Sequence, residues 1–306
     1  MLQRNSPKAV GIFSGVGGAC QGFEQAGFKH LLAVDFDKHA VEAYRQNFPE
    51  SPIEQWDMFE KNGQDILLRI GLAKGELDLL HCEASCRFIS TAGLRDPEAK
   101  DAQLLLSVTP QLIRDIQPKS WFIENVDGLI KGSYLPVFYD LKRKLDELKD
   151  YNWDFRILNA LDYNTPTIRK RFIAIGVRKD ISSRPITFPK PTTIDYNALR
   201  ANQVAKHLLW LYTGYFFRES KKKHARNFMY TLTKTMNVKV RTTEGEKRFL
   251  NYAELLMFNG FPRDWKIPGS LSLQWARIGN AVPPPLAYSV AKHIRDEFFQ
   301  SHRENK

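Results

Sequence analysis

The amino-acid sequence predicts an α/β fold in which a doubly wound, mostly parallel sheet is joined to a second, smaller domain. Two observations predict this fold. Over the first 180 residues, short apolar runs alternate with segments of helical periodicity, which is the pattern of repeated strand–helix units. After Arg178 the alternation stops at a Pro- and Thr-rich stretch, ITFPKPTTIDY, which is typical of a linker into a different unit.

The expected elements follow from apolar periodicity and from turn signals. Right-handed crossovers would stack the strands into one sheet. The expected strands are 9–13, 30–34, 78–81 and 121–124, followed by a late pair at 155–159 and 171–176. The expected helices follow the first strand up to about residue 26 and then span 38–47, 102–115, 135–149 and 286–299, with a further helix near 202–216.

Composition excludes several classes of protein. Of the 306 residues, 43% are hydrophobic and 26% are charged, which are ordinary globular values and exclude a disordered, collagen-like or coiled-coil chain. No long uncharged apolar run and no secretory segment is present, so we expect a cytoplasmic protein without a signal peptide or membrane span. The three cysteines, Cys20, Cys82 and Cys86, are too few for a disulfide framework.

The basic charge is concentrated in one segment. The whole chain has 45 Lys and Arg against 34 Asp and Glu, a formal charge of +11. Residues 181–247 hold 13 of these bases and only 4 acids, which gives +9. Aromatic residues accompany them, as expected of a surface that follows a phosphate backbone. A solvated basic face is the alternative that the charge alone leaves open.

Acids and glycines near the N-terminus suggest an adenosyl site. The first strand runs into the turn Phe13–Gly18, where glycines permit a close approach of the backbone to a ligand. Asp35 ends the second strand and Asp57 follows a third apolar segment, so their carboxylates could accept hydrogen bonds from a ribose and an adenine amino group. A plain glycine turn with two surface acids is the alternative.

Other residues carry reactive or charged groups at strand ends. Cys86 follows the strand that ends near His81, and it could be a nucleophile or a small buried filler. A zinc site of His81, Cys82 and Cys86 is not expected, because no second group of ligands accompanies them. Glu124 ends an apolar strand, where it could be a proton donor with a raised pKa or a simple cap.

Two further segments precede late elements of the predicted fold. Arg169 and Arg171 come just before a strand and would point the same way, as donors to a carbonyl or a phosphate. The rigid loop around Asn280 could brace a ligand or only join two elements.

Taken in order, these segments resemble the motifs of the DNA cytosine-5 methyltransferases over nearly the whole chain. The matching segments are Phe13–Gly18, Val34-Asp35, Asp57, the loop around Cys86, Glu124-Asn125-Val126, Arg169-Lys170-Arg171, residues 251–262 and residues 279–284. The resemblance implies a Rossmann-like fold dependent on S-adenosylmethionine, with methylation of C5 on a cytosine flipped out of duplex DNA.

The resemblance also assigns roles to residues. Cys86 would add to cytosine C6, Glu124 would hold and protonate N3, and Arg169 and Arg171 would neutralise O2. The residues expected around the cofactor are Phe13, Gly15, Gly17, Gly18, Asp35, Phe36, Asp57, Leu105 and Asn280. Those expected to contact DNA are Arg87, Lys221, Lys222, Lys223 and Arg226.

The same resemblance implies an organisation and partners. Residues 1–180 and 270–306 would form the catalytic domain, and 181–269 a small target-recognition domain. We expect a monomer that acts on double-stranded DNA and associates with the nucleoid through it. A cognate restriction endonuclease is an optional partner, and an RNA substrate is disfavoured.

The chain departs from the family pattern around the expected nucleophile. Its loop is Glu83-Ala84-Ser85-Cys86-Arg87 where the family has a Gly-Pro-Pro-Cys-Gln-like loop, and Thr167 replaces a glutamine. Three explanations compete: an active enzyme with compensating changes, an enzyme with an altered substrate or transferred group, and a DNA-binding relative without turnover. The first is favoured because Cys86, Glu124, Arg169 and Arg171 are kept.

Overall fold

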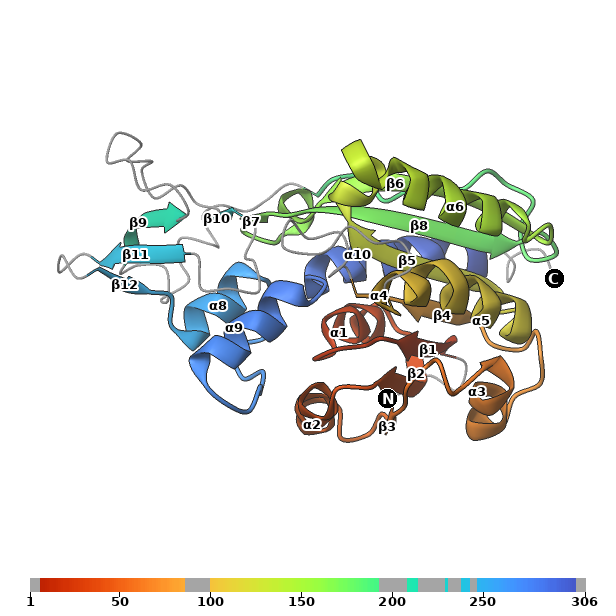
Figure 1. Ribbon diagram of the computed structural model, residues 1–306, viewed down its shortest axis with the longest axis horizontal. Helices are drawn as coiled ribbons and strands as arrows, with labels where there is room; N and C mark the ends of the chain where they lie inside the picture. The colour runs from red at the N-terminus through yellow and green to blue at the C-terminus, as the bar shows by residue number, and fades with distance from the viewer. Residues whose placement is uncertain are drawn as a thin grey trace.

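The computed structural model describes residues 6–85, 100–192, 208–213, 229–230, 238–242 and 247–300. Its centre is a seven-stranded sheet with the order β3-β2-β1-β4-β5-β8-β6 (Figure 1). The first five strands of this order pair in parallel, while β8 runs antiparallel to both β5 and β6. The strands are β1 (Lys8–Ile12), β2 (Lys29–Asp35), β3 (Ile53–Gln55), β4 (Leu79–Cys82), β5 (Ser120–Val126), β6 (Tyr151–Asn159) and β8 (Lys170–Arg178). The predicted doubly wound, mostly parallel sheet is therefore confirmed.

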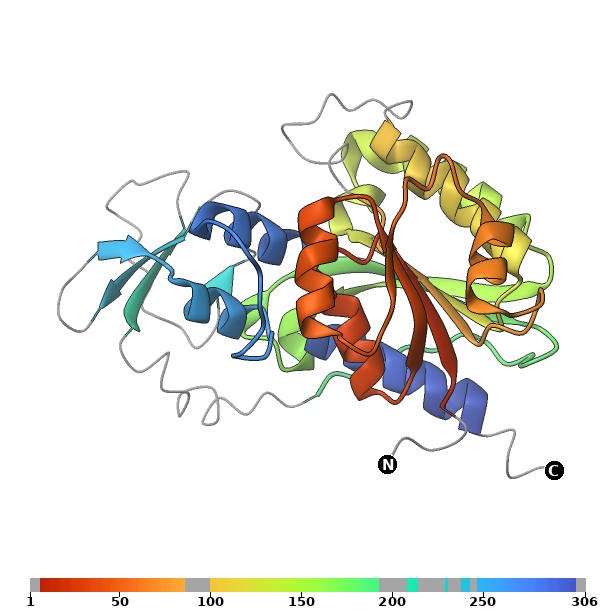
Figure 2. The ribbon, with the colours of Figure 1, turned by 90° about the horizontal axis from the view of Figure 1, so that it is seen from below.

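Helices cover both faces of this sheet, as Figure 2 shows. Neighbouring residues of a central strand point to opposite faces, so Trp121 and Phe122 of β5 are both fully buried, in different clusters. One face is covered by α3 (Gly63–Ile70), α5 (Thr109–Ile116) and α6 (Leu135–Asp146). The other face is covered by α1 (Gly18–Gln25) and α10 (Pro284–Ile294), with α2 (Lys38–Asn47) beside α1. None of the helices in the described part of the chain is long and apolar enough to cross a membrane.

The remaining strands form a small sheet apart from the large one. Its antiparallel order is β12-β11-β9, from β9 (Leu208–Thr213), β11 (Val238–Thr242) and β12 (Lys247–Phe249). Two helices, α8 (Tyr252–Phe258) and α9 (Leu271–Asn280), lie between this sheet and the large one in both views (Figures 1 and 2). A short parallel pair, β7 (Thr167–Ile168) with β10 (Met229–Tyr230), joins the two regions.

The prediction of a helix near 202–216 is wrong for residues 208–213, the part of that segment that the structure describes. Residues 208–213 form β9, which pairs with β11 from Thr213 opposite Val238 to Leu208 opposite Thr242. The sequence LLWLYT is apolar throughout, and such a run has no period that separates a strand from a helix. Its aromatic residues suit a strand once a partner is available.

The helix predicted at 102–115 is interrupted. It consists of α4 (Lys100–Gln103), a π-helical turn (Leu104–Val108) and α5. Pro110 near the start of α5 has no N–H to donate to the preceding turn. The chain instead widens, and the backbone N–H and the hydroxyl of Thr109 both bond to the Leu104 carbonyl. The last helix is similar: α10 ends at Ile294 and continues as a π-helical turn (Arg295–Gln300).

The segment before α9 packs on the large domain. The Trp265 ring meets Phe48 at the end of α2 edge-on, with 5.2 Å between the centroids. The Asn47 side chain donates to the Lys266 carbonyl oxygen and accepts from the Lys266 N–H. The division at residues 180 and 269 stays a prediction. This packing favours a chain that returns to the large domain earlier than residue 269.

Close packing of α1 on α10 gives a stability prediction. A Cβ at Gly22 would lie 2.5 Å from the backbone atoms Pro284 O and Tyr288 N. Replacing a helical glycine by alanine ordinarily stabilises by about 1 kcal/mol. Here we expect Gly22→Ala to lower the free energy of unfolding by about 1 to 3 kcal/mol, because the two helices must separate. Urea unfolding would measure it, with Gln21→Ala on the same helix as the control. A gain in stability for Gly22→Ala would contradict this packing.

Candidate functional site

A pocket opens where β1, β2, β4 and β5 end. The carboxyl ends of parallel strands meet at this edge, which is where open α/β sheets bind ligands. Nine of the residues predicted from the sequence line it: Phe13, Gly15, Gly18, Asp35, Phe36, Glu124, Arg169, Arg171 and Asn280. The pocket therefore brings together residues that the prediction divided between the cofactor and the reacting base.

The turn from β1 into α1 forms one wall. Phe13, Gly15 and Gly17 have φ angles of 63°, 55° and 87°, a left-handed backbone that glycine adopts most easily. Gly18 is needed for another reason, because a Cβ there would lie 2.2 Å from the Val282 carbonyl oxygen. The turn thus brings the backbone of Gly15 and Gly18 to the pocket at the start of a helix, beside Phe13, Ser14 and Val16.

Asp35 and Phe36 form the next part of the wall. One carboxylate oxygen of Asp35 accepts from the Gly15 N–H at 2.7 Å, and the other accepts from the Asp37 N–H at 2.9 Å. Burial raises the pKa of Asp35, and these two N–H donors oppose that effect. Each oxygen keeps a lone pair for a ligand hydroxyl. The Phe36 side chain beside it is 60% exposed, which leaves an aromatic face open at the pocket.

A buried ion pair lies deeper in the pocket. Nε of Arg171 is 2.8 Å from Oε1 of Glu124, and both side chains are less than 10% exposed. Burial raises the pKa of Glu124, while the guanidinium groups of Arg171 and Arg169 act against it. The site therefore holds a carboxyl group that is easier to protonate than an ordinary glutamate, with a cation beside it.

Arg169 uses its side chain to hold the loop after α9. Its Nη2 donates to the carbonyl oxygens of Gly279 and Ala281 at 2.8 and 2.9 Å, and the residue is fully buried. The prediction treated Arg169 as a donor to a ligand. In the structure it both lines the pocket and fixes the loop that carries Asn280.

The loop that leads to the expected nucleophile is anchored up to Ser85. The Glu83 N–H bonds to the Ile12 carbonyl oxygen, and Nδ2 of Asn125 donates to the Ala84 carbonyl oxygen at 3.1 Å. Glu83, Ala84 and Ser85 all line the pocket. Cys86 and Arg87 lie outside the described residues, as do Lys221, Lys222, Lys223 and Arg226.

Three predicted cofactor residues do not line the pocket. Gly17 is the N-cap of α1 and turns away from it. Asp57 follows β3 and accepts a hydrogen bond from the Phe59 N–H. Leu105 is fully buried in the core, while its neighbour Leu104 lines the pocket.

Sequence reasoning missed several residues of the site. Asn125 was part of a recognised motif but received no role, although it holds the loop at Ala84. Arg277 lines the pocket and pairs with Asp37 at 2.6 Å. The two are separated by 240 positions, so no local pattern could reveal their contact. Glu83 was noted only as a departure from the family loop.

Comparison with known proteins identifies a family and similar sequences. The family model of the C-5 cytosine-specific DNA methylases matches residues 8–242 and 210–296. The Type II methyltransferase M.FnuDI of Fusobacterium nucleatum is 26% identical, over 98% of this chain and 97% of the relative. M1.HphI of Haemophilus parahaemolyticus is also 26% identical, over 93% of this chain and 86% of the relative.

Solved structures share the fold. A protein encoded within an E. coli prophage, described as a DNA modification methyltransferase, superposes with a TM-score of 0.74 at 21% identity, covering 95% of this chain and 99% of that one. The Entamoeba histolytica methyltransferase EhMeth gives 0.69 at 16% identity, covering 96% and 99%. Since the family model spans nearly all of the sequence, the chain belongs to the C-5 cytosine-specific DNA methylase family.

Proposed function

We propose that this protein methylates C5 of cytosine in duplex DNA through a covalent adduct between Cys86 and C6 of a flipped-out base. The observation that carries the proposal is the buried Glu124–Arg171 pair, which lies in one pocket with Ser85, the residue before Cys86. Membership of the family supports a cytosine-C5 DNA methyltransferase in general. The covalent adduct and the base flipping are proposed in addition to this general activity.

The cofactor of this family is S-adenosylmethionine, which supplies an electrophilic methyl group. The residues of the pocket fit it. The backbone at Gly15 leaves room for a ligand to approach, because a Cβ there would meet no atom of the described residues within 4 Å, and Asp35 has lone pairs free for ribose hydroxyls. The exposed ring of Phe36 offers a face for an adenine to stack on.

Glu124 is assigned to the cytosine ring. Cytosine C5 is a poor nucleophile until a thiolate adds to C6, and that addition is favoured when N3 is protonated or hydrogen-bonded. Burial raises the pKa of Glu124, so the carboxyl group keeps its proton at a higher pH than a free glutamate and can donate it to N3. Arg171, 2.8 Å away, holds the carboxyl in place and stabilises the carboxylate once the proton has moved.

Cys86 is assigned as the nucleophile, on a loop whose preceding residues are held in place. Asn125 fixes the Ala84 carbonyl, so it is a positioning residue for that loop. Thr167 stands where the family has a glutamine, and its hydroxyl donates to the Phe258 carbonyl oxygen. This contact links β7 to α8 and offers a substitute for a lost amide contact.

DNA recognition is assigned to the small sheet and to the basic segment around it. Arg87, Lys221, Lys222, Lys223 and Arg226 stay predictions for phosphate contacts. The relatives named above are Type II methyltransferases, the modification enzymes of restriction–modification systems. A monomer, nucleoid association and a cognate endonuclease are proposed on the same ground. A relative that binds DNA and S-adenosylmethionine without turnover is the alternative, and no feature of the described residues favours it.

Product analysis tests the proposal directly. The full chain is incubated with isotope-labelled S-adenosylmethionine and duplex DNA of mixed sequence, and the nucleosides are analysed by mass spectrometry. We expect labelled 5-methylcytosine from the unchanged protein and none from Cys86→Ala. Cys82→Ala, a buried cysteine outside the pocket lining, is the control. Tight binding of DNA without product would support the non-catalytic alternative, and an unexpected nucleoside mass would indicate a different transferred group.

The role of Glu124 predicts a pH profile. The neutral carboxyl is needed, and its raised pKa keeps it neutral up to a higher pH than usual, so the rate should fall as the pH rises through that value. Glu124→Gln should lower kcat by about 100-fold and remove this alkaline decline, because an amide donates at every pH. Steady-state rates across pH would show both. Glu147→Gln, an exposed glutamate, is the control. If the rate of Glu124→Gln still falls at alkaline pH, the decline arises from the titration of another group.

The basic segment predicts a salt effect. Replacing Lys221, Lys222 and Lys223 by Ala should weaken duplex binding and reduce the slope of log Kd against log salt by about 2 to 3, since each lysine releases about one counterion. Fluorescence anisotropy with a labelled duplex would measure it. The control replaces Lys142 and Lys144 on α6, which pair with Asp146 and Asp140. If both variants show the same salt slope, Lys221, Lys222 and Lys223 do not contact DNA phosphates.

A further inference from the structure

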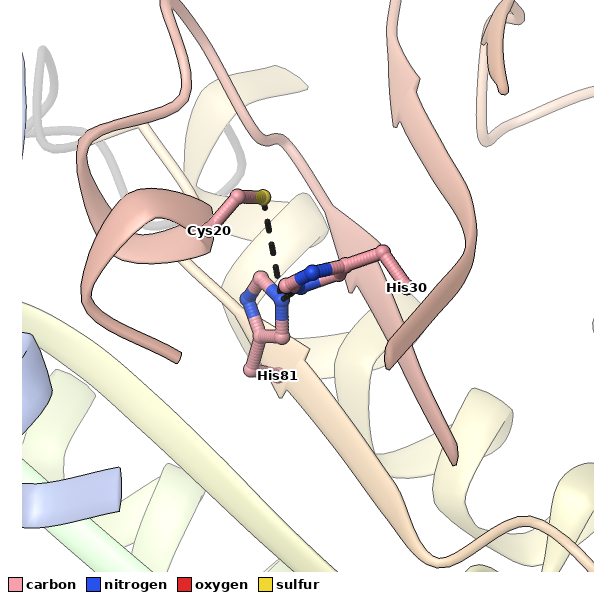
Figure 3. A group of neighbouring side chains, drawn as sticks. All are labelled: Cys20, His30 and His81. Atoms are coloured by element: carbon pink, nitrogen blue, oxygen red, sulfur yellow. Dashed lines mark hydrogen bonds between the residues drawn. The ribbon is translucent and has the colours of Figure 1, made fainter. Parts of the chain in front are cut away.

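A second group of reactive side chains lies beneath the pocket, inside the fold. Cys20 of α1, His30 of β2 and His81 of β4 point toward one another from three elements (Figure 3). Their side-chain donor atoms all lie within 4.8 Å of one another. All three residues are at most 2% exposed. None of them has a role in the proposed methyl transfer.

The sheet is shaped to let these side chains meet. His30 and His81 lie on the two strands that flank β1, and Gly11 of β1 pairs directly with His81. A Cβ at Gly11 would lie 2.5 Å from the His81 ring, so only glycine leaves room there. The Phe23 ring stacks on the His81 ring, with 4.7 Å between the centroids and nearly parallel planes. The imidazole is thus fixed in place by packing.

The ring nitrogens are divided in the way that metal-binding histidines require. Nε2 of His30 and Nε2 of His81 face each other at 2.8 Å, and Sγ of Cys20 is 3.9 Å from the latter. On the far side of each ring, Nδ1 faces a carboxylate: Glu83 at 2.7 Å from His81 and Glu24 at 3.4 Å from His30. Metal-ligating histidines typically donate their second N–H to a carboxylate in this way.

The distances suit a small divalent ion. Zinc binds thiolate at about 2.3 Å and imidazole at about 2.0 to 2.1 Å, which at a tetrahedral angle separates two nitrogens by about 3.3 Å and a sulfur and a nitrogen by about 3.6 Å. The observed 2.8 Å between the two nitrogens is shorter than this separation by about 0.5 Å, and the observed 3.9 Å between sulfur and nitrogen is longer by about 0.3 Å.

With Glu24 and Glu83 both ionised, proton counting favours an ion over a bare histidine pair. In a neutral pair only one Nε2 carries a proton for the contact between the rings, so one of the two Nδ1 atoms then faces its carboxylate without a proton. Nδ1 of His30 indeed has no hydrogen-bond partner among the described residues. An ion between the two Nε2 atoms frees both Nδ1–H groups to donate to Glu24 and Glu83, and the two carboxylates and the thiolate offset its charge.

We propose that Cys20, His30 and His81 form a buried binding site for a divalent transition metal of the zinc type. The hydroxyl of Ser14 lies beside the cluster, since the same Cβ position at Gly11 is 2.7 Å from both Ser14 Oγ and His81 Nε2. That oxygen, or a water held by it, completes the fourth position. The ion would join α1, β2 and β4 directly below the turn that begins at Phe13, as a structural site with no part in catalysis.

The site is tested on the full chain, produced with a purification tag that contains neither histidine nor cysteine. Because the donors are buried, the metal is supplied during expression, as zinc or as cobalt(II) in minimal medium. We expect about one equivalent of metal per chain by plasma mass spectrometry. The cobalt protein should show a thiolate-to-cobalt charge-transfer band in the near ultraviolet, and this measurement needs no variant.

Variants then locate the ion. Cys20→Ala should abolish the charge-transfer band, and Cys20→Ala and His30→Gln should each lower the bound metal more than about tenfold. Cys82→Ala is the matched control, since Cys82 is buried on β4 next to His81 but packs on the opposite face of the sheet. Chains that hold no metal and show no band would overturn the proposal and leave a hydrogen-bonded histidine pair. Metal that survives in Cys20→Ala and His30→Gln would overturn it as well. No readout requires methyl transfer, so the outcome is independent of the proposed function.

Discussion

The buried guanidinium of Arg169 ties the start of β8 to the loop that follows α9. Its bonds to Gly279 and Ala281 connect the start of β8 to a loop 110 positions later in the chain. A buried cation without such partners would be costly, so this loop has little freedom to move away. The loop in turn meets the β1–α1 turn, where Gly18 touches Val282. The shape of the pocket therefore depends on a contact that joins its first and last segments.

Much of the scaffold could be predicted because local signals agreed with the fold. The helix over 38–47 was predicted with the bounds of α2, where apolar periodicity coincides with the Asp37 cap. The helix prediction was wrong for the β9 segment because an all-apolar run has no period that separates a strand from a helix. The π-helical turn was not predicted because its signal is a single proline, Pro110. Sequence also predicted nine of the 22 residues that line the pocket, several of them because they sit at strand ends.

Contacts made by residues far apart in the chain could not be predicted. The pairing of Arg277 with Asp37, and the convergence of Cys20 with His30 and His81, require knowledge of which strands are neighbours. His81 was weighed with Cys82 as a metal ligand because the two are adjacent in sequence. Adjacent residues of a strand face opposite sides of a sheet, so their proximity in sequence argued against a shared site.

The reversal of β8 makes strand register a condition for the chemistry. In a parallel sheet the ligand edge receives only carboxyl ends of strands, but an antiparallel strand delivers its beginning there, and with it Arg171. Val126 pairs with Arg171 and Glu124 with Ile173, so the backbone ladder alone sets how far the guanidinium lies from the carboxyl group. A slip of one residue in either strand would turn one of the two groups into the opposite layer of helices. Insertions within β5 or β8 should thus be excluded in proteins that keep this pair.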